Sequence, residues 1–544
     1  MHKASKSADH FDFIIVGGGS AGCVLAEKLS RCGRFEVALI EAGGSGKSPL
    51  VTMPGGVAAL LQHPRLNWQL RSDDQLPRQS RGHFTPRGKG LGGSSAINAM
   101  IYTRGAQSDY DGWAQQTSEH WSWQQLLPRF RRLENNQRGA DQYHGDQGPL
   151  HVSDVEPYYE VSKRFIAAGV EAGIPHNNDF NGGDLYGVGA FQFTMHNGER
   201  FGTRRAFLEP ALTRKNLTVI TNAQVEQVVI KQQQATGVLI RRGRHASQFI
   251  AARREVILSA GAFHSPQLLM LSGIGPAEEL RRHGIITVVD SSDVGANLQE
   301  HVDSLVHYRN QQRDSLCLRP LGLGKLALET LSYWRNRSGA MAHPPSEVGG
   351  FLRSSPTVET PDIQLHLVPT RFADNGYDLR PAFSHGFACH ACVLRPRTRG
   401  RLYLHSAEVK QAPGFTYDFL SEHEDQEVLL SAIKQVRDIM AQPAMAEHNG
   451  GELIPGASNS DDELLASLKF HAGLIYHPTS TCRMGNDANA VVDAQLRVNG
   501  VAGLRVVDAS IMPTVISGNT NAPTMVIADV GADFILADTA SNTP

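Results

Sequence analysis

The pattern of apolar and polar positions near the start of the chain predicts a strand, a helix and a second strand. Residues 11–16 form a short apolar run, typical of a parallel strand that is buried on both faces. A glycine-rich turn follows, then a helical pattern over residues 23–29 and a second apolar run over residues 37–40 that ends at Glu41. Two strands joined in this way by a helix form a βαβ unit.

Strand patterns recur along most of the chain. Residues 216–230 and 235–240 alternate between apolar and polar side chains, which predicts antiparallel strands. Residues 254–262 contain a buried strand that ends in a turn, and residues 503–513 repeat this pattern near the C-terminus. Strands that belong to one nucleotide-binding domain are therefore spread over most of the sequence.

A chain of 544 residues is too long for one ordinary core and should form two domains or one large composite unit. Because the strand patterns are dispersed, we expect a discontinuous nucleotide-binding domain made of residues 11–155, 215–310 and 476–538. The segments between them, residues 156–214 and 311–475, are expected to form the substrate-binding domain.

Composition and charge narrow the function classes. Hydrophobic residues make up 41% and charged residues 19% of the chain, as in an ordinary globular protein, and the net charge is −2. Nothing in this balance indicates a nucleic-acid partner or a strong attraction to anionic lipid. The polar N-terminus does not resemble a signal peptide, and no apolar run reaches the roughly 18 residues that span a bilayer. We therefore expect a cytoplasmic protein, with peripheral contact at the inner face of the membrane left open.

Six scattered cysteines do not form a disulfide framework and fit a reducing compartment. Cys389 and Cys392 have C-x-x-C spacing, but no second pair of ligands lies nearby in the sequence, so no metal site is expected. The favoured interpretation is two small side chains on a buried strand, with a metal or redox role as the alternative. Cys482 is interpreted as a packing residue.

The glycine-rich turn carries the first chemical signal. Gly17, Gly19 and Gly22 form G-x-G-x-x-G between a strand and a helix, the context that a dinucleotide-binding turn requires. Backbone N–H groups at the start of such a helix bind a pyrophosphate. Glu41, 19 residues beyond Gly22, is placed to accept hydrogen bonds from the ribose hydroxyls and would repel a 2′-phosphate. This argues against NADP, whereas NAD and FAD both remain compatible with the turn.

Three later segments favour FAD, because distant parts of a flavoprotein return to enclose the cofactor. Residues 87–102 form a glycine- and hydroxyl-rich loop, residues 259–275 place a tight turn before a helix, and residues 506–533 carry Asp508 at a strand end. With the βαβ unit, these segments give the predicted cofactor-binding residues: Gly17, Gly19, Ser20, Ala21, Gly22, Glu41, Ala42, Trp68, Arg87, Gly88, Gly92, Gly93, Ser94, Asn98, Ala99, Met100, Val225, Ala260, Gly261, Asp508, Ala509, Asn521, Pro523 and Thr524.

These blocks resemble the glucose–methanol–choline (GMC) oxidoreductases over nearly the whole chain. The matching blocks are the N-terminal βαβ unit, "GKGLGGSSAIN", "GAFHSPQLLMLSGIG", "YHPTSTCRMG" and "GNTNAPTMVIA"; a further stretch, "VGANLQEH", has Glu300 where Asp is commoner in the family. Within the family, the chain is most similar to bacterial choline dehydrogenases and flavin-linked alcohol dehydrogenases. The resemblance implies an α/β fold in which a discontinuous Rossmann-like FAD-binding domain carries an α+β substrate domain built on an antiparallel sheet.

The resemblance also implies the chemistry. His477 of the H-P motif is expected to act as the general base on an alcohol, and Asn521, 44 residues later, to bind the alcohol oxygen. Hydride would pass to flavin N5, and the electrons would leave to a quinone or another carrier rather than to NAD. Some family members bond FAD through a histidine where this chain has Ile97, so non-covalent FAD is expected. The expected reaction is the oxidation of primary aliphatic alcohols to aldehydes.

Alternatives stay open within this framework. A choline dehydrogenase would need a cage for a quaternary ammonium, for which Glu347, Trp68, Tyr102 and Tyr476 are candidates. An alcohol oxidase would pass electrons to O₂, with Ile475 controlling oxygen access to the flavin. A hydroxynitrile lyase and a non-enzymatic FAD-binding module are less favoured. A serine hydrolase is disfavoured because the chain lacks a G-x-S-x-G motif in the required strand-to-helix setting.

Overall fold

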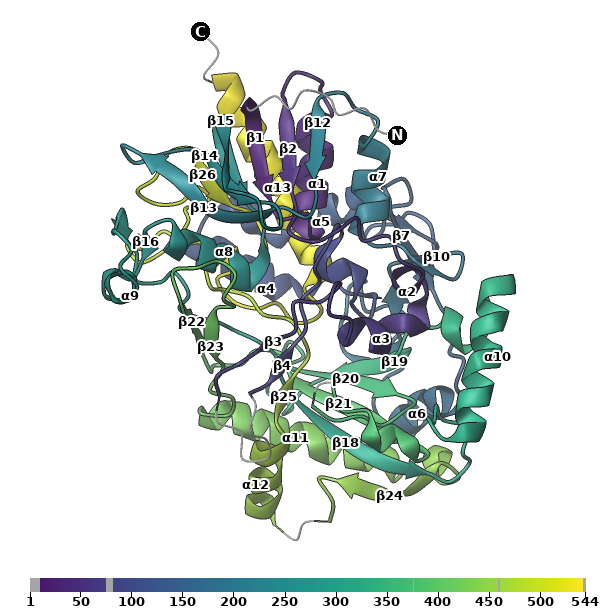
Figure 1. Cartoon of the computed structure of the whole chain (residues 1–544). Helices are drawn as coiled ribbons and strands as arrows, with labels where there is room; N and C mark the ends of the chain where they lie inside the picture. The colour runs from purple at the N-terminus through teal and green to yellow at the C-terminus, as the bar shows by residue number, and fades with distance from the viewer. Residues whose placement is uncertain (1–9, 75–81, 375, 458–459, 542–544) are drawn as a thin grey trace.

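The computed structural model describes residues 10–74, 82–374, 376–457 and 460–541 and arranges them around two large sheets (Figure 1). In the first sheet, β1 (His10–Val16) pairs in parallel with β2 (Val37–Ile40), and α1 (Ser20–Ser30) connects them, as the βαβ pattern predicts. The other neighbour of β1 is β15, also parallel. The sheet order is β12 (Leu217–Ile220), β2, β1, β15 (Gln248–Leu258), β14 (Gln234–Arg241) and β13 (Gln224–Lys231), with β26 (Leu504–Val506) pairing with β15.

One strand of this sheet differs from its prediction. Residues 216–230 were expected to be antiparallel throughout, but β12 runs parallel to β2, whereas β13 pairs antiparallel with β14. β12 lies at the edge of the sheet, and part of it is exposed. An edge strand of a parallel sheet can therefore show the same alternation as an antiparallel strand, and the alternation does not distinguish the two.

The last helix covers the first one. α13 (Asn521–Ser541) packs against α1, and both lie along the first sheet (Figure 1). Asp529 accepts hydrogen bonds from Lys28 Nζ (2.7 Å) and from Arg129 Nη1 (2.8 Å) of α5 (Trp123–Leu133). The C-terminal segment is therefore part of the nucleotide-binding unit, although almost the whole sequence separates it from β1.

The second sheet is antiparallel, as the family resemblance implies. One face is covered by α6 (Glu160–Glu171), α11 (His423–Met440) and α12 (Asp461–His471), whose apolar side chains share a core with the strands. The strand order is β24 (Asn449–Ile454), β18 (Val302–Asn310), β21 (Gly386–Val393), β20 (Ile363–Val368), β19 (Val348–Leu352) and β8 (Gly187–Ala190), with β25 (Gly473–Leu474) pairing with β18.

β18 corrects the expected division of the chain. Residues 302–310 were assigned to the nucleotide-binding domain, yet β18 pairs with β21 and β24 inside the second sheet. The buried pattern of this strand fits either sheet, and only pairing across long sequence distances decides between them. We propose the same two-domain division with this boundary moved to residue 301.

Cys389 and Cys392 lie on β21, where every residue is buried, in agreement with the buried-strand interpretation. Because they are three residues apart on a strand, their side chains point to opposite faces of the sheet. Cys389 belongs to the apolar core, whereas Cys392 Sγ donates to Asp303 Oδ1 on the other face. The two sulfurs therefore cannot share one metal ion.

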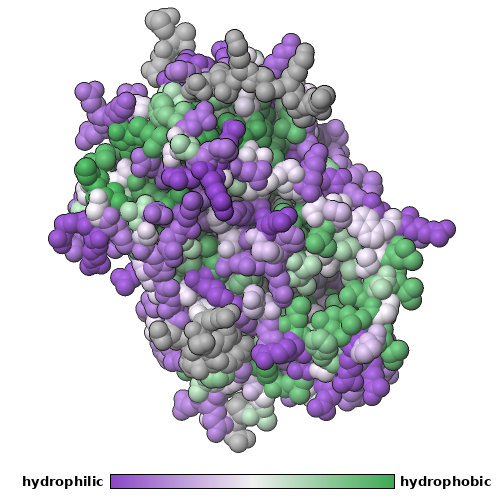
Figure 2. Space-filling view, viewed as in Figure 1, coloured by the Kyte–Doolittle hydropathy of each residue, from purple (hydrophilic) through white to green (hydrophobic). Residues whose placement is uncertain are grey.

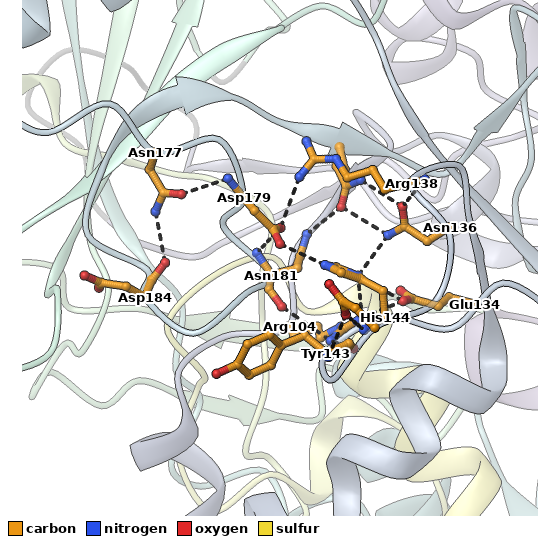
Figure 3. Close-up of polar contacts among 12 residues, drawn as sticks. Arg104, Glu134, Asn136, Arg138, Tyr143, His144, Asn177, Asp179, Asn181 and Asp184 are labelled. Carbon is orange, nitrogen blue, oxygen red and sulfur yellow. Dashed lines mark hydrogen bonds and ion pairs between the residues drawn. The ribbon is translucent and has the colours of Figure 1, made fainter.

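A small third sheet contains β6 (Glu134–Asn136) and is held by a buried polar network (Figure 3). Glu134 accepts hydrogen bonds from Arg104 Nη2 (2.7 Å) and His144 Nδ1 (3.1 Å), and Asp179 accepts one from His144 Nε2 (2.8 Å). Asn136 Nδ2 (3.0 Å) and Arg104 Nη2 (3.2 Å) also approach His144 Nδ1, while the two carboxylates favour the protonated ring. The hydrogen bonds to Asp179 and Glu134 outweigh burial and raise the pKa of His144 to about 9.

Candidate active site

A cavity of about 410 Å³ lies between the two large sheets and is lined by segments from Val16 to Thr524. Its volume and mixed lining are typical of a site for a cofactor together with a small molecule. One end is formed by the turn after β1 and by the start of α1, at the carboxyl edge of the parallel strands. This is the edge at which open α/β sheets bind nucleotides.

The glycine turn at this end leaves no room for side chains. A Cβ atom on Gly22 would lie 1.9 Å from Gly17 O, and one on Gly93 would lie 2.6 Å from Gly19 Cα. Gly17 also has a φ of 104°, which favours glycine. The close approach of the two loops exposes backbone N–H groups at the start of α1 to the cavity, the arrangement that a pyrophosphate requires.

Glu41 is fixed at the end of β2 by backbone donors. Its Oε2 accepts from Gly18 N (2.8 Å), and its Oε1 accepts from Gly43 N (2.7 Å) and Gly90 N (3.0 Å). Burial raises the pKa of this carboxyl, an effect that the three backbone hydrogen bonds oppose. Glu41 also faces the cavity, so its remaining lone pairs are available to ribose hydroxyls.

Most residues of the predicted cofactor set face this cavity. Gly22, Gly92 and Pro523 do not line it, and Gly22 acts instead by permitting the close contact with Gly17 O. Asp508 has a bracing role in addition, because its carboxylate accepts from Gly261 N (2.8 Å) and Ser265 Oγ (2.6 Å) at the start of α8 (Gly261–Leu271). The predicted residues that line the cavity are Gly17, Gly19, Ser20, Ala21, Glu41, Ala42, Trp68, Arg87, Gly88, Gly93, Ser94, Asn98, Ala99, Met100, Val225, Ala260, Gly261, Asp508, Ala509, Asn521 and Thr524.

His477 faces the other part of the cavity and belongs to a chain of hydrogen bonds. Its Nδ1 lies 3.0 Å from His301 Nδ1, and His301 Nε2 lies 3.0 Å from Ile516 O. A carbonyl oxygen only accepts, so His301 carries its proton on Nε2 and accepts through Nδ1. His477 must then carry its proton on Nδ1, which leaves Nε2 as its unprotonated nitrogen.

The electrostatic surroundings keep both rings neutral. Burial holds the pKa of His477 well below its usual 6.5, and the neighbouring His301 and His366 act in the same direction. Burial likewise lowers the pKa of His301 to about 4. At neutral pH His477 is therefore an unprotonated base whose reactive nitrogen is defined by its neighbours.

The amide beside this nitrogen belongs to Asn519, and not to Asn521 as expected. Asn519 Nδ2 lies 3.1 Å from His477 Nε2. Asn521 is the first residue of α13, and its Oδ1 accepts from Ser20 Oγ (2.7 Å), which places it at the start of α1. Both asparagines occur in "GNTN", and the point at which the helix begins decides which one reaches the base. The sequence spacing could not locate that point.

Two further side chains orient Asn519. Its Oδ1 accepts from Gln364 Nε2 (3.2 Å) of β20, and its backbone N–H donates to Thr103 Oγ1 (2.8 Å). With the amide oxygen occupied in this way, Nδ2 is directed toward His477. Thr103 directly precedes Arg104 of the buried network, so that network supports the catalytic end of the cavity.

Sequence reasoning also missed the roles of Glu300 and His301, although "VGANLQEH" was noted. Glu300 Oε1 accepts from His477 N (2.7 Å) and from His301 N (3.0 Å), so one carboxyl positions the backbone of both histidines. Burial raises the pKa of Glu300 to about 8, and the nearby Arg87 only partly offsets this. The usable signal was a carboxyl directly before a histidine in a stretch that the family resemblance had already singled out.

The remaining wall of the cavity is largely apolar. Glu347, considered as a carboxylate for a quaternary ammonium, does not line the cavity; its Oε1 accepts from Tyr158 N (2.9 Å). Tyr102 does not line the cavity either, whereas Trp68, Tyr476 and Ile475 do. Among the described lining residues, the only carboxylates are Glu41 and Asp508, both at the dinucleotide end. The apolar side chains around the outer part are Leu61, Leu316, Met341, Val368, Phe372 and Leu379.

A glycine turn on a parallel sheet, a carboxylate for ribose and a neutral buried base facing one cavity define a dinucleotide-dependent oxidoreductase. Comparison with known proteins gives the family. Two family models described as GMC oxidoreductase match residues 11–303 and 396–528. The chain belongs to the GMC oxidoreductase family.

The relatives cover nearly the full length. An "alcohol dehydrogenase [acceptor]" of Pseudomonas putida is 43% identical over 97% of this chain and 96% of its own length. An "oxygen-dependent choline dehydrogenase" of Photobacterium profundum is 40% identical over 98% and 95%. Among solved structures, pyridoxine 4-oxidase from Mesorbium loti has a TM-score of 0.86 at 30% identity, covering 96% of this chain and 98% of that one. A formate oxidase variant of Aspergillus oryzae has a TM-score of 0.89 at 26% identity, covering 98% and 99%.

The cofactor is FAD, bound non-covalently, and the residues present fit it. The α1 turn and the opposing Gly93 loop leave space only for a backbone-bound group, as a pyrophosphate needs. Ile97 lines the cavity and offers no nucleophile for a covalent link.

Proposed function

We propose that the protein oxidises primary aliphatic alcohols to aldehydes and passes the electrons to a quinone or another acceptor that is not NAD. The observation that carries this proposal is the unprotonated Nε2 of His477, which lies 3.1 Å from Asn519 Nδ2 where both residues line the cavity. When bound, FAD would supply the hydride acceptor at flavin N5.

The side chains of the protein accept the proton, stabilise the developing charge and exclude water. His477 Nε2 accepts the hydroxyl proton as negative charge develops on the alcohol oxygen, because its proton-free state is fixed by His301. Asn519 Nδ2 can turn its N–H toward the same oxygen and stabilise the charge. The apolar outer wall holds an alkyl chain and excludes water, which strengthens both interactions.

Choline oxidation is the second candidate, because choline dehydrogenases match nearly as well as the alcohol dehydrogenase does. The structure gives weaker support to a quaternary ammonium than to an alkyl chain. Glu347 is engaged by the Tyr158 backbone, and Asp303 accepts a 2.7 Å hydrogen bond from His390 Nδ1. Trp68 and Tyr476, which line the cavity, are the features that a cation would use.

The test is anaerobic addition of hexanol, benzyl alcohol and choline to the purified yellow protein. Bleaching of the oxidised flavin absorption fastest with hexanol is the expected result. Faster bleaching by choline would replace the proposal with the second candidate. A flavin that no alcohol bleaches would contradict the proposal and favour lyase chemistry. Admitting air afterwards distinguishes an oxidase, whose colour returns at once, from a dehydrogenase, whose colour returns with a quinone.

A further inference from the structure

One helix of the substrate domain presents an unusual number of large apolar side chains to solvent. α10 (Pro320–Asn336) lies at the edge of the molecule, and hydrophobic residues gather on this side of the surface (Figures 1 and 2). Phe383 lies at the start of the helix, where its carbonyl accepts from Arg319 Nε. The exposed side chains, which we name the α10 patch, are Leu321 (92%), Leu323 (48%), Leu328 (70%), Leu331 (63%), Trp334 (44%) and Phe383 (53%).

The inner side of α10 is firmly attached, so the patch has a fixed orientation. Tyr333 is fully buried and packs with Met53 and Met341. Glu329 accepts from Ala340 N (2.8 Å) and from Tyr158 Oη (3.1 Å). The apolar face therefore points outward because the opposite side of the helix is bound to the domain.

The charged side chains on the outer face of α10 are both cations. Lys325 and Arg335 are exposed, and neither takes part in an ion pair among the described residues. Lys325 lies one helical turn from both Leu321 and Leu328, and Arg335 lies one turn from Leu331, so the cations and the leucines share a face. Glu329, the only acidic residue of α10, is turned inward. Although the whole chain carries a net charge of −2, this face is basic.

The patch is adjacent to the cavity. Leu316, four residues before the helix, lines the cavity, and so do Ala340 and Met341, four and five residues after it. Both ends of α10 thus connect to segments of the cavity wall.

We propose that the α10 patch docks the protein on an anionic lipid bilayer. Leucine and tryptophan side chains enter the boundary between headgroups and acyl chains, while Lys325 and Arg335 extend their charged ends to the lipid phosphates. The bilayer then delivers lipid-soluble alcohols, and a quinone, next to the cavity. This docking goes beyond the proposed alcohol oxidation. Because membrane binding is measured without turnover, an experiment can contradict the docking and leave the proposed reaction standing, or the reverse.

A lipid surface fits the patch better than a second copy of the chain. A symmetric dimer brings the same patch of both copies together. Pairing two α10 helices in this way would gather four cations, with no acidic residue of the outer face to neutralise them. Anionic lipid headgroups supply the missing negative charge.

The test is co-sedimentation of the FAD-loaded protein with vesicles of equal parts phosphatidylcholine and phosphatidylglycerol, and with vesicles of phosphatidylcholine alone. We expect binding to the anionic vesicles that weakens as salt increases. The double variant L328S/L331S and the double variant K325E/R335E should each bind at least about tenfold more weakly. The control is Ile286→Ser, since Ile286 is 85% exposed but lies outside the patch.

A second measurement reports the depth of α10 directly. Brominated lipids should quench the fluorescence of the wild-type protein, and the quenched fraction should be smaller in Trp334→Phe. FAD content and circular dichroism establish that each variant is folded. Wild-type protein that stays in the supernatant, or variants that bind like the wild type, would overturn the proposal. A dimer in solution that L328S/L331S converts to monomers, without vesicle binding, would assign the patch to a second copy instead.

Discussion

At the catalytic end of the cavity, a backbone carbonyl determines which nitrogen of His477 acts as the base. Ile516 O orders His301, and His301 orders His477, so a proton-free Nε2 is present before substrate arrives. A histidine without such a chain distributes its proton between two nitrogens, and only part of the population is then ready to react.

Replacing His301 should therefore slow catalysis without removing the cofactor. His301→Leu removes the acceptor for His477 Nδ1–H, and we expect the rate of flavin reduction to fall about tenfold or more. His301→Gln offers an amide oxygen as acceptor and should retain more activity than His301→Leu. Stopped-flow reduction under anaerobic conditions measures both. Equal losses in the two variants would indicate a structural role only.

The pH profile of the wild type belongs to the same test. Because the pKa of His477 is held well below 6.5, the base stays unprotonated above that pH. Protonation on the acid side would remove the lone pair. The reduction rate should accordingly be level above pH 6.5 and fall only at lower pH.

Variants of Asn519 and Asn521 should have different effects: one should slow flavin reduction, and the other should weaken FAD binding. Asn519→Ala removes the donor beside His477 Nε2, and we expect flavin reduction to slow by about 10²-fold with FAD retained. Asn521→Ala removes a contact to Ser20 at the start of α1, so it should weaken FAD retention and leave the rate of the FAD-saturated enzyme closer to normal. The opposite pattern would restore Asn521 as the catalytic amide.

At the scale of elements, the β1–α1 turn can form only because Gly22 has no Cβ atom. Gly22→Ala would place Cβ 1.9 Å from Gly17 O, so the turn must open and the N–H groups of α1 must move. We expect purified Gly22→Ala to contain little FAD by absorbance. Gly112→Ala in α4 (Gln107–Gln116) is the matched control, since its added Cβ meets nothing within 4 Å, and it should keep its FAD. Full FAD content in Gly22→Ala would contradict the assignment of the turn.

The network around His144 predicts a pH dependence of stability. The pKa of His144 rises from 6.5 to about 9 on folding, so the folded state binds the proton more tightly. The resulting stabilisation is fully present below pH 6.5 and is lost as pH rises through about 9. His144→Gln should lower the melting temperature at pH 6, because Asp179 and Glu134 each lose one hydrogen-bond partner while Glu134 keeps Arg104; the loss of unfolding free energy should be roughly 2 kcal/mol. The difference from wild type should shrink at pH 9.5, as melting curves at both pH values would reveal.

At the scale of the whole molecule, both sheets and the connections between them contribute walls to one cavity. A ligand that binds only the folded state stabilises it by mass action, by about 4 kcal/mol at a thousandfold excess over Kd. Removing FAD should therefore lower the melting temperature of the entire chain in one transition. Two separate transitions, of which only one responds to FAD, would show that the units unfold independently.

The sequence predicts those parts of the structure that depend on near neighbours. β1, α1, β2 and Glu41 lie within one short segment, and their periodicity and glycines determine them locally. β12 and β18 were misplaced because strand pairing joins residues that are far apart in sequence. Alternation shows which side of a strand is buried, but it does not identify the neighbouring strand.

The unexpected position of Asn519 beside His477 and the unnoticed α10 patch have related causes. Two asparagines in one motif differ only in whether they precede or begin a helix, and a boundary error of two residues exchanges their roles. The leucines of α10 look like core residues in the sequence, since periodicity shows that a helix has an apolar face. Only the packing of the domain shows that this face is left uncovered.

The position of α13 has a consequence for how the protein matures. His477, Asn519 and the helix that covers α1 all follow the glycine turn by more than 400 residues and are synthesised long after it. Until those residues are made, the glycine turn of β1 and α1 can meet the Gly93 loop but lacks α13 and the catalytic histidine. A translation product truncated before residue 477 would therefore lack a working site even though its nucleotide-binding signature is intact.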